Sequence, residues 1–108
     1  MSNVVPTTDQ TFEKDTSAGV TLTDFWATWC GPCRMQSPAV EKVAADDEMK
    51  VVKITKMDVD ENPETTKNLG IMSIPTLLVK KDGKIVDKIV GYHSPEQIKT
   101  ILKGYMDK

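Results

Sequence analysis

The first third of the chain alternates short apolar runs with a stretch of helical pattern. Val4 and Val5 predict a short strand that Pro6 ends, and Phe12 marks the buried side of a short helix that follows. Residues 20–26 are rich in β-branched and aromatic types, which is typical of a strand. This part of the chain therefore predicts a strand, a helix and a second strand.

The middle third predicts one long helix and one strand. The helix is expected from about Pro32 to Glu48, because proline is favoured within a first helical turn and a helical pattern follows it. Pro38 lies inside this helix, and its ring and missing N–H are expected to bend it. Residues 51–57 then predict a third strand.

The last third predicts a helix and a hairpin. Asn62 and Pro63 begin the helix as a cap followed by proline, and Gly70 ends it. Residues 76–79 and 85–90 predict two strands joined by a turn that contains Asp-Gly, which is typical of a β-hairpin.

A final helix completes the order βαβαβαββα. It begins at Ser94, where Ser-Pro-Glu-Gln forms a capping box. Its buried face follows the i, i+3, i+4, i+7 rule with Ile98, Ile101, Leu102 and Tyr105. Early alternation predicts parallel strands with right-handed crossovers, and the hairpin adds antiparallel ones. We expect an α/β fold over residues 1–108: one domain with a mixed five-stranded sheet sandwiched by four helices.

The composition of the chain limits the classes of protein to which it can belong. The 108 residues suit one domain with one core. Hydrophobic residues make up 39% of the chain and charged residues 28%, as in ordinary soluble globular proteins. The net charge of −2 argues against a general nucleic-acid binder.

The sequence shows neither an apolar segment long enough to span a membrane nor the basic and apolar start of a signal peptide. That absence predicts a cytoplasmic protein. In that compartment, a chain with two cysteines is more often redox-active than stapled by a structural disulfide.

Cys30 and Cys33 are the two cysteines of the chain. Their spacing places them one turn apart on a helix face, and it suits a disulfide, whose Cα atoms lie roughly 4.4–6.8 Å apart. Such a bond closes a small ring and constrains little else. The pair therefore suits reversible chemistry better than architecture.

The two thiols are expected to differ. Cys30 is predicted at the N-cap of the long helix, where backbone N–H groups are unpaired and the helix dipole is positive. Its thiolate can accept the N–H of Cys33, while Pro32 offers none, so the pKa of Cys30 is expected below the roughly 8.5 of free cysteine. We expect Cys30 to face outward and attack, and Cys33 to stay protonated nearer the core until it resolves the mixed disulfide.

Asp24 lies in the middle of an apolar strand, and two interpretations are open. It either faces solvent at a strand end or is a buried carboxyl with a raised pKa. In the second case it accepts the proton of Cys33, directly or through a water. Lys56, from the neighbouring strand, is then expected to temper the rise in its pKa.

The segment 24–33, Asp-Phe-Trp-Ala-Thr-Trp-Cys-Gly-Pro-Cys, together with Ile-Pro-Thr at 74–76, resembles the thioredoxin family. A CxxC pair alone is a weak signal, but this combination is very specific, and the resemblance runs from Phe12 to the C-terminal helix. It implies the thioredoxin fold. It also implies a thiol–disulfide oxidoreductase that reduces disulfides in other proteins and serves cell redox homeostasis.

The resemblance also assigns a second site element. In the family, the proline that matches Pro75 is cis and lies against the active-site disulfide. The exposed backbone of Ile74 is then expected to pair with an extended substrate segment, as in strand addition. A flat apolar rim around Cys30 is expected from Trp29, Gly31, Pro32, Ile74 and Gly91, with Val90 and Tyr92.

Several positions depart from the family pattern. Lys80 stands where a large apolar residue is common, so it either extends to the sheet edge or lies on a less well covered face. Thr21 and Thr23 replace aliphatic residues, which is expected to lower stability. Tyr92 and residues 72–73 alter the rim and with it the choice of partner.

The other residues that could belong to a functional site are expected to have no catalytic or metal-binding role. Trp26 is interpreted as core packing beneath the site and His93 as a solvated loop residue. The acidic residues Asp58, Asp60 and Glu61 lack the glycine and final glutamate of an EF-hand loop and are interpreted as solvated charge.

The sequence fits three other classes of function less well. A zinc module needs four ligands, and the chain has no second CxxC and one histidine, so only a shared site in a dimer fits. A c-type haem needs histidine where Arg34 stands. A redox-inert scaffold is disfavoured because both sulfurs and Asp24 are in place. An oxidase or isomerase stays possible, although Gly-Pro between the thiols resembles reductases.

The resemblance also implies the source of electrons and the proteins with which the chain reacts. No cofactor is expected to bind the chain, and electrons are expected from NADPH through a flavin-containing thioredoxin reductase. Clients of the kind the family serves are ribonucleotide reductase and peroxiredoxins. A monomer without nucleic-acid or membrane partners is expected.

Overall fold

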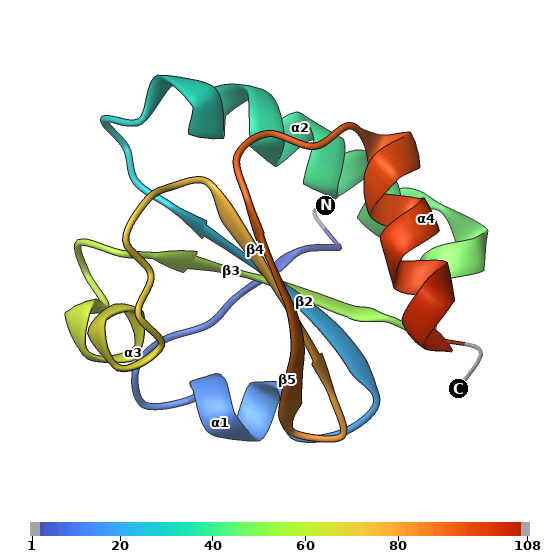
Figure 1. The fold of residues 1–108 in the computed structure, drawn as a ribbon, viewed down its shortest axis with the longest axis horizontal. Coiled ribbons are helices and arrows are strands. Elements are labelled where there is room, and N and C mark those ends of the chain that lie inside the picture. The colour runs from blue at the N-terminus through green and yellow to red at the C-terminus, as the bar shows by residue number, and fades with distance from the viewer. Residues whose placement is uncertain (1–2, 107–108) are drawn as a thin grey trace.

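One five-stranded sheet forms the middle layer of the protein (Figure 1). The computed structural model describes residues 3–106, so the ends of the predicted 1–108 domain lie outside the described residues. The strands are β1 (Val5–Pro6), β2 (Val20–Trp26), β3 (Lys53–Asp58), β4 (Thr76–Lys81) and β5 (Lys84–Val90). Their order is β1-β3-β2-β4-β5. β3 runs parallel to β1 and β2, and β4 runs antiparallel to β2 and β5, which confirms the mixed sheet.

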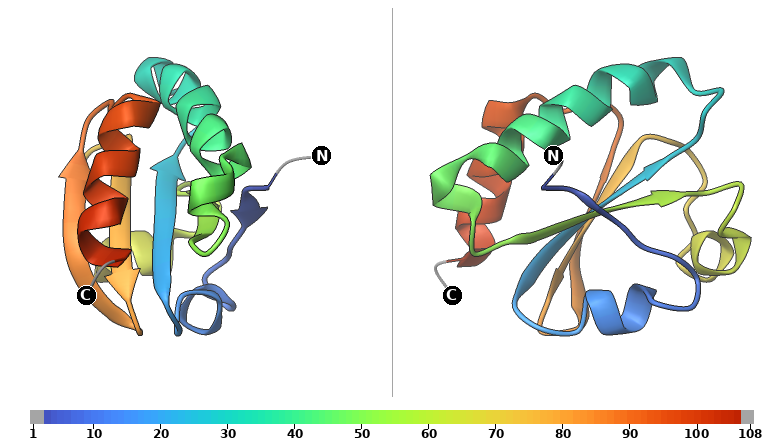
Figure 2. Two further views of the ribbon diagram at one scale, coloured as in Figure 1. Left: turned by 90° about the vertical axis from the view of Figure 1, so that its right-hand side faces the viewer. Right: turned by 180° about the vertical axis from the view of Figure 1, so that it is seen from behind.

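Helices cover both faces of this sheet (Figures 1 and 2). They are α1 (Phe12–Asp15), α2 (Gly31–Ala45), α3 (Pro63–Asn68) and α4 (Pro95–Met106). α2 and α4 lie on one face, and α1 and α3 lie on the other. The predicted order of elements is confirmed, and so is the α/β fold with four helices.

The side chains of β2 alternate between the two layers, as the period of a strand requires. Leu22 belongs to the larger apolar cluster, which includes Val40 of α2 and Leu102 of α4. Phe25 faces the other layer, where its ring meets the ring of Phe12 edge-on at 6.3 Å. β2 is the middle strand, and both of its faces are covered. It therefore holds the residues at its C-terminal end in well-defined positions.

Two predicted boundaries are wrong in the segment after α2. The helix ends at Ala45 and not at Glu48, because Asp46 has extended backbone and its carboxylate accepts the N–H of Glu48 at 2.8 Å. That bond begins a separate 3₁₀ turn, Asp47–Met49. β3 then begins at Lys53, since the chain first closes a turn in which the N–H of residue 52 donates to the carbonyl of Met49. α2 continues through residue 38, and the expected bend there stays a prediction.

The predicted hairpin is confirmed, although β4 is longer than expected and runs to Lys81. Asp82 and Gly83 form the turn with φ values of +50° and +84°. Positive φ at both central residues is the requirement of the tight hairpin turn that Asp-Gly favours.

Both predictions for Lys80 are wrong. β4 is an inner strand, so its side chain does not reach a sheet edge, and the residue is only 3% exposed because α1 covers it. Its Nζ donates to Thr16 Oγ1 at 2.8 Å and lies 4.8 Å from the centre of the Phe12 ring. It also lies 3.5 Å from the exposed carboxylate of Glu13.

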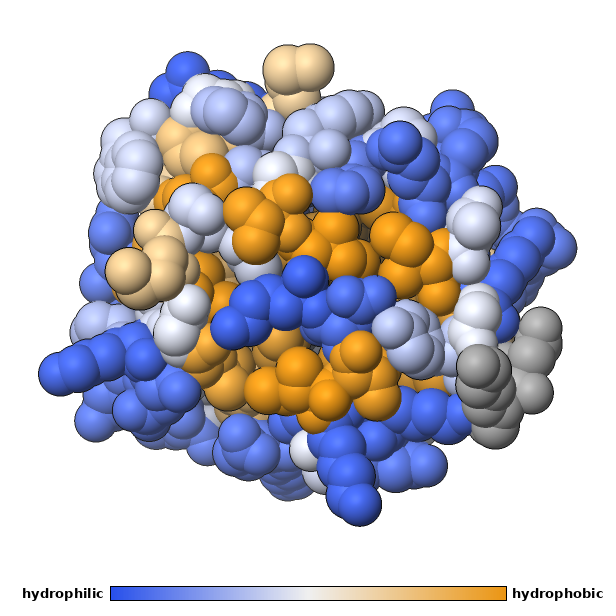
Figure 3. Space-filling view, viewed as in Figure 1, coloured by the Kyte–Doolittle hydropathy of each residue, from blue (hydrophilic) through white to orange (hydrophobic). Residues whose placement is uncertain are grey.

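β5 is an edge strand and leaves apolar side chains in solvent. Ile85, Val86 and Val90 are exposed. Figure 3 shows apolar side chains gathered on this face, in the region of β4 and β5, with a polar band between them. Lys84 and Lys88 on the same strand are charged, and charges on an edge oppose pairing with another strand. Within residues 3–106, no helix is long and apolar enough to cross a bilayer.

Candidate active site

Cys30 lies where β2 has ended and α2 begins. The chain leaves β2 at Trp26 and makes one turn, in which the N–H of Cys30 donates to the carbonyl of Ala27 at 3.2 Å. Cys30 is the N-cap of α2, with extended backbone, and its Sγ accepts the N–H of Cys33 at 3.2 Å. A sulfur at this place meets an unpaired backbone donor and the positive end of a 15-residue helix.

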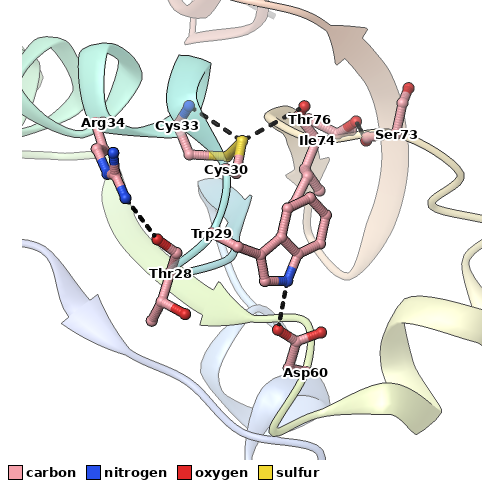
Figure 4. The surroundings of a disulfide bond; sticks show 9 residues. All are labelled: Thr28, Trp29, Cys30, Cys33, Arg34, Asp60, Ser73, Ile74 and Thr76. Carbon is pink, nitrogen blue, oxygen red and sulfur yellow. Dashed lines mark hydrogen bonds between the residues drawn. A yellow bond between two sulfur atoms is a disulfide. The ribbon is translucent and has the colours of Figure 1, made fainter.

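Cys30 and Cys33 form a disulfide, with Cα atoms 5.3 Å apart (Figure 4). Gly31 and Pro32 lie between them in the first turn of α2, and the latter has no N–H to compete for the sulfur. The capping bond therefore goes to one sulfur alone. This distinguishes the two cysteines by hydrogen bonding, as the sequence predicted.

The expected difference in exposure is wrong. Cys30 and Cys33 are each only 3% exposed. They form a small apolar cluster with Ala27, against which Trp26 and Ile74 pack. Cys30 is covered because the loop before β4 lies over it. In this disulfide form the two residues are equally buried, and the hydrogen bond from the N–H of Cys33 to Cys30 Sγ distinguishes their sulfurs.

The loop before β4 brings the second site element to the cysteines. The carbonyl oxygen of Ile74 lies 3.8 Å from Cys30 Sγ, and the Ile74–Pro75 peptide bond is cis. Gly91, at the end of β5, donates its N–H to the carbonyl of Pro75 at 2.9 Å. Gly91 has a φ of +90°, which favours glycine. Ile74 is thus placed beside Cys30, and Gly91 is bonded to the residue that follows Ile74.

Trp29 forms the most prominent part of the predicted rim and is 66% exposed. Its Nε1 donates to the carboxylate of Asp60 at 2.8 Å, which fixes the ring (Figure 4). Asp60 is exposed, as its interpretation as solvated charge requires, and in addition it anchors the Trp29 ring. Asp58 accepts the N–H groups of residues 60 and 61 and forms the turn that presents this carboxylate.

A groove of about 390 Å³ lies beside Cys30 on the side of Trp29. Its walls are mostly apolar, and they include Met72 and Ile74 from the loop before β4. Met72 is 93% exposed and unbranched, so its side chain can adapt to different partners. The groove offers space for an apolar side chain next to the disulfide.

Asp24 is buried, so the solvent-facing interpretation is wrong. Leu22, two residues earlier on β2, packs in the cluster with α2, and the period of a strand places Asp24 on the same face. Its Oδ1 has no hydrogen-bond partner. Burial raises the pKa of Asp24 to about 7, and the charge of Lys56, its register neighbour on β3, lowers it by less.

Trp26 lies beneath the cysteines, as expected. His93 is a half-buried loop residue, and its Nδ1 bonds to the carbonyl of Gly91 at 2.9 Å. Among the described residues, no group of three His, Cys, Asp or Glu side chains converges as metal ligands.

The comparisons with known proteins agree on one family. The family model for thioredoxin matches residues 3–104. The thioredoxin of Listeria monocytogenes is 54% identical to this chain, over 92% of this chain and 95% of its own length. That of Staphylococcus aureus is 50% identical over 95% and 98%. The solved structure of a Malassezia sympodialis thioredoxin, Mala s 13, superposes with a TM-score of 0.87 at 31% identity, covering 98% and 93% of the two chains.

Proposed function

Since the chain belongs to the thioredoxin family, whose members are thiol–disulfide oxidoreductases, we propose that Cys30 and Cys33 carry out its protein-disulfide reduction in two unequal steps. The single observation that supports this order is the hydrogen bond from the N–H of Cys33 to the sulfur of Cys30. It stabilises negative charge on one sulfur only.

In the first step, the Cys30 thiolate of the reduced protein attacks one sulfur of a client disulfide. A bond forms between Cys30 and that sulfur, the client S–S bond breaks, and the other client sulfur leaves as a thiolate. The N-cap position favours the attacking thiolate before the bond forms.

In the second step, Cys33 resolves the mixed disulfide. Its thiol gives its proton to the Asp24 carboxylate, directly or through a water, and its sulfur attacks Cys30 Sγ. The bond between Cys30 and the client breaks, and the second client sulfur leaves as a thiolate. The client has gained two electrons, and the chain holds the Cys30–Cys33 disulfide.

Asp24 suits the role of proton acceptor because of where it lies. Its carboxyl is on the α2 face of the sheet, buried, with one oxygen unpaired. A pKa of about 7 lets it exist in both protonation states near neutral pH. The positive charge of Lys56 keeps that pKa from rising further, so we assign Lys56 the role of modulating Asp24.

Clients are proposed to bind across the rim formed by Trp29, Gly31, Pro32, Ile74, Pro75 and Gly91. An extended client segment would pair with the backbone of Ile74, whose carbonyl lies next to Cys30. The groove beside Trp29 would take a neighbouring apolar side chain. Together these contacts would hold the client disulfide next to Cys30, of which only 3% is exposed.

The family needs no bound cofactor of its own, and its members work with thioredoxin reductase and disulfide-containing clients. We propose that NADPH supplies the electrons through a flavin-containing reductase, and that ribonucleotide reductase and peroxiredoxins are among the clients. We place this chemistry in the cytoplasm, where thiols are kept reduced. One domain over residues 1–108 is proposed because all five strands belong to one sheet.

Reduction of insulin by dithiothreitol tests the proposal. The chain is expected to accelerate precipitation of the reduced insulin chains, and Cys30→Ser is expected to abolish that acceleration. The control is Ser37→Ala, which removes the hydroxyl of an exposed serine later in α2 and leaves both cysteines in place. If Cys30→Ser accelerates the reaction as well as the wild type does, the proposal fails.

A further inference from the structure

Gln36 is a buried amide in a helix face that is otherwise apolar. Beyond the cysteines, the buried residues of α2 are Gln36, Ala39, Val40, Val43 and Ala44. Gln36 is fully buried, one turn after Cys33. Its Nε2 donates to the carbonyl of His93 at 2.9 Å, and its Oε1 accepts the N–H of the same residue at 2.8 Å. Packing alone does not require an amide here.

This reciprocal pair joins α2 to the loop between β5 and α4, which passes close to that helix (Figure 1). Both backbone groups of His93 are satisfied by one side chain, and rotation of the amide by 180° would lose both bonds. The orientation of the loop relative to α2 is thereby fixed. An apolar side chain of the same length could fill the space but could not hold the loop.

The same loop carries the far side of the rim. The ring of His93 holds the carbonyl of Gly91 through a protonated Nδ1, since a carbonyl only accepts. Gly91 in turn donates its N–H to the carbonyl of Pro75. Tyr92 is exposed and lies between these two anchored residues. A continuous set of bonds therefore runs from Gln36 on the cysteine-bearing helix to the loop that covers Cys30.

We propose that Gln36 is a positioning residue for client recognition: it holds the Gly91–His93 loop in register with the cysteines, so that Tyr92 and the backbone of Gly91 meet a protein client bound over Cys30. This inference rests on the proposed function, because it assumes that the rim binds clients. Both hydrogen bonds of the Gln36 amide go to the backbone of His93, so the exchange chemistry itself does not depend on it.

Gln36→Met tests the proposal, because methionine has the same unbranched length and removes both bonds. The KM for insulin is expected to rise about fivefold while kcat stays within about twofold, since a contact made equally before and during the reaction is lost. The reduction rate of 5,5′-dithiobis(2-nitrobenzoate), which is too small to span the rim, is expected to stay within about twofold. Amide hydrogen exchange at His93 is expected to accelerate.

Two further variants keep the test decisive. Gln36→Glu keeps an acceptor for the N–H of His93 and loses the donor, so a smaller rise in KM is expected; it is measured in place of Gln36→Met if that variant does not fold. Ile54→Val is the control for lost stability, because Ile54 lies in the core on β3 and its side chain holds no part of the loop.

The outcomes separate this inference from the function on which it rests. An unchanged KM for insulin in Gln36→Met overturns the role of Gln36, as does an equal rise in Ile54→Val or an equal loss of rate with the small disulfide. If the wild type itself reduces neither substrate, the proposed function fails and not this assignment alone.

Discussion

Asp24 and Lys56 lie opposite one another in the parallel register of β2 and β3, yet the carboxylate is left with an unpaired oxygen. Two effects act on its pKa. Loss of hydration raises it, and the charge of Lys56 lowers it by less, so that it stands at about 7 in place of 3.8. The fold therefore maintains an acid at a cost in stability, and that cost depends on pH.

Asp24→Asn is expected to stabilise the protein at pH 8 but not at pH 4. The folded state binds the Asp24 proton up to about pH 7, whereas the unfolded chain releases it near pH 3.8. The free energy of unfolding contributed by Asp24 therefore falls as pH rises from about 4 to about 7 and is level above that. The full difference corresponds to about 4 kcal/mol, and about 2 kcal/mol is expected because the buried amide also loses hydration.

Urea unfolding of both proteins at pH 4, 6 and 8 measures this effect. The gain of Asp24→Asn over the wild type is expected to grow across the series. Asp47→Asn, the same substitution at an exposed position, is the control and is expected to show no such growth. A gain of the same size at all three pH values would contradict a raised pKa at Asp24.

Asp24→Asn is also expected to slow the resolving step more than the attack. The amide cannot accept the proton of Cys33, whereas the Cys30 thiolate needs no such acceptor. General-base catalysis typically contributes about 10²–10⁴-fold, so a loss of at least tenfold in resolution is expected. In the wild type that step is expected to accelerate with pH through about 7, the pKa of Asp24.

Rapid acid quenching and gel analysis without reductant measure the two steps separately. Attack is followed by the appearance of the mixed disulfide, and resolution by its disappearance. Asp47→Asn again serves as the control. Equal slowing of both steps would remove Asp24 from the mechanism.

Cys33→Ser is expected to trap mixed disulfides with clients. The hydroxyl of serine cannot replace the resolving sulfur, while Cys30 keeps the capping N–H that comes from the backbone of residue 33. The measurement is a gel without reductant after incubation with an oxidised client, and Cys30→Ser is the control that should trap nothing. A lane without adducts for Cys33→Ser would count against the resolving role.

Much of this arrangement was open to prediction from the sequence, because local patterns determine it. Strands with β-branched residues, capped helix starts and the Asp-Gly turn each act over a few residues, and the predicted order of elements is confirmed. The wrong predictions of element boundaries lie where a residue can take part in either of two local structures. Asp46 can cap a turn as well as continue a helix, and the sequence alone did not decide between them.

The site was harder to predict where it depends on residues far apart in the chain. Cys30 is covered by the loop at Ile74, and no local pattern shows that contact. The family resemblance placed Pro75 against the disulfide, but it did not predict that the loop would bury Cys30. The bond of Asp60 to Trp29 joins two loops and was missed for the same reason. One feature of the sequence could have pointed to Gln36. It is a polar residue on the buried face of the helix, one turn after Cys33.

Thr21→Val and Thr23→Val are expected to have opposite effects on stability. Both threonines are fully buried on β2, but Thr21 Oγ1 has no hydrogen-bond partner, whereas Thr23 Oγ1 bonds to Thr55 Oγ1 at 2.8 Å. Valine at 21 removes an unpaired hydroxyl, and valine at 23 leaves Thr55 with a poorer bond. A gain of about 1 kcal/mol and a loss of about 1 kcal/mol are expected in urea unfolding. Changes of the same sign would refute this account of the two hydroxyls.

Lys80→Met is expected to leave stability unchanged or raise it by about 1 kcal/mol, although it removes an ion pair and a cation–π contact. The ammonium is buried while its partner Glu13 is exposed, so the pair gains little and the lysine has lost its hydration. Thr16 is not left unpaired, since its hydroxyl donates to the carbonyl of Phe12 at 2.8 Å.

Methionine keeps an unbranched side chain of similar length at this buried position, and so it fills the space of the lysine stem. Lys80→Ala is the matched variant that loses this packing together with the charge, and a loss of about 2 kcal/mol is expected from the space left under α1. Urea unfolding of both variants measures the difference. If Lys80→Met were as destabilised as Lys80→Ala, the charge and not the stem would be what holds α1 on the sheet.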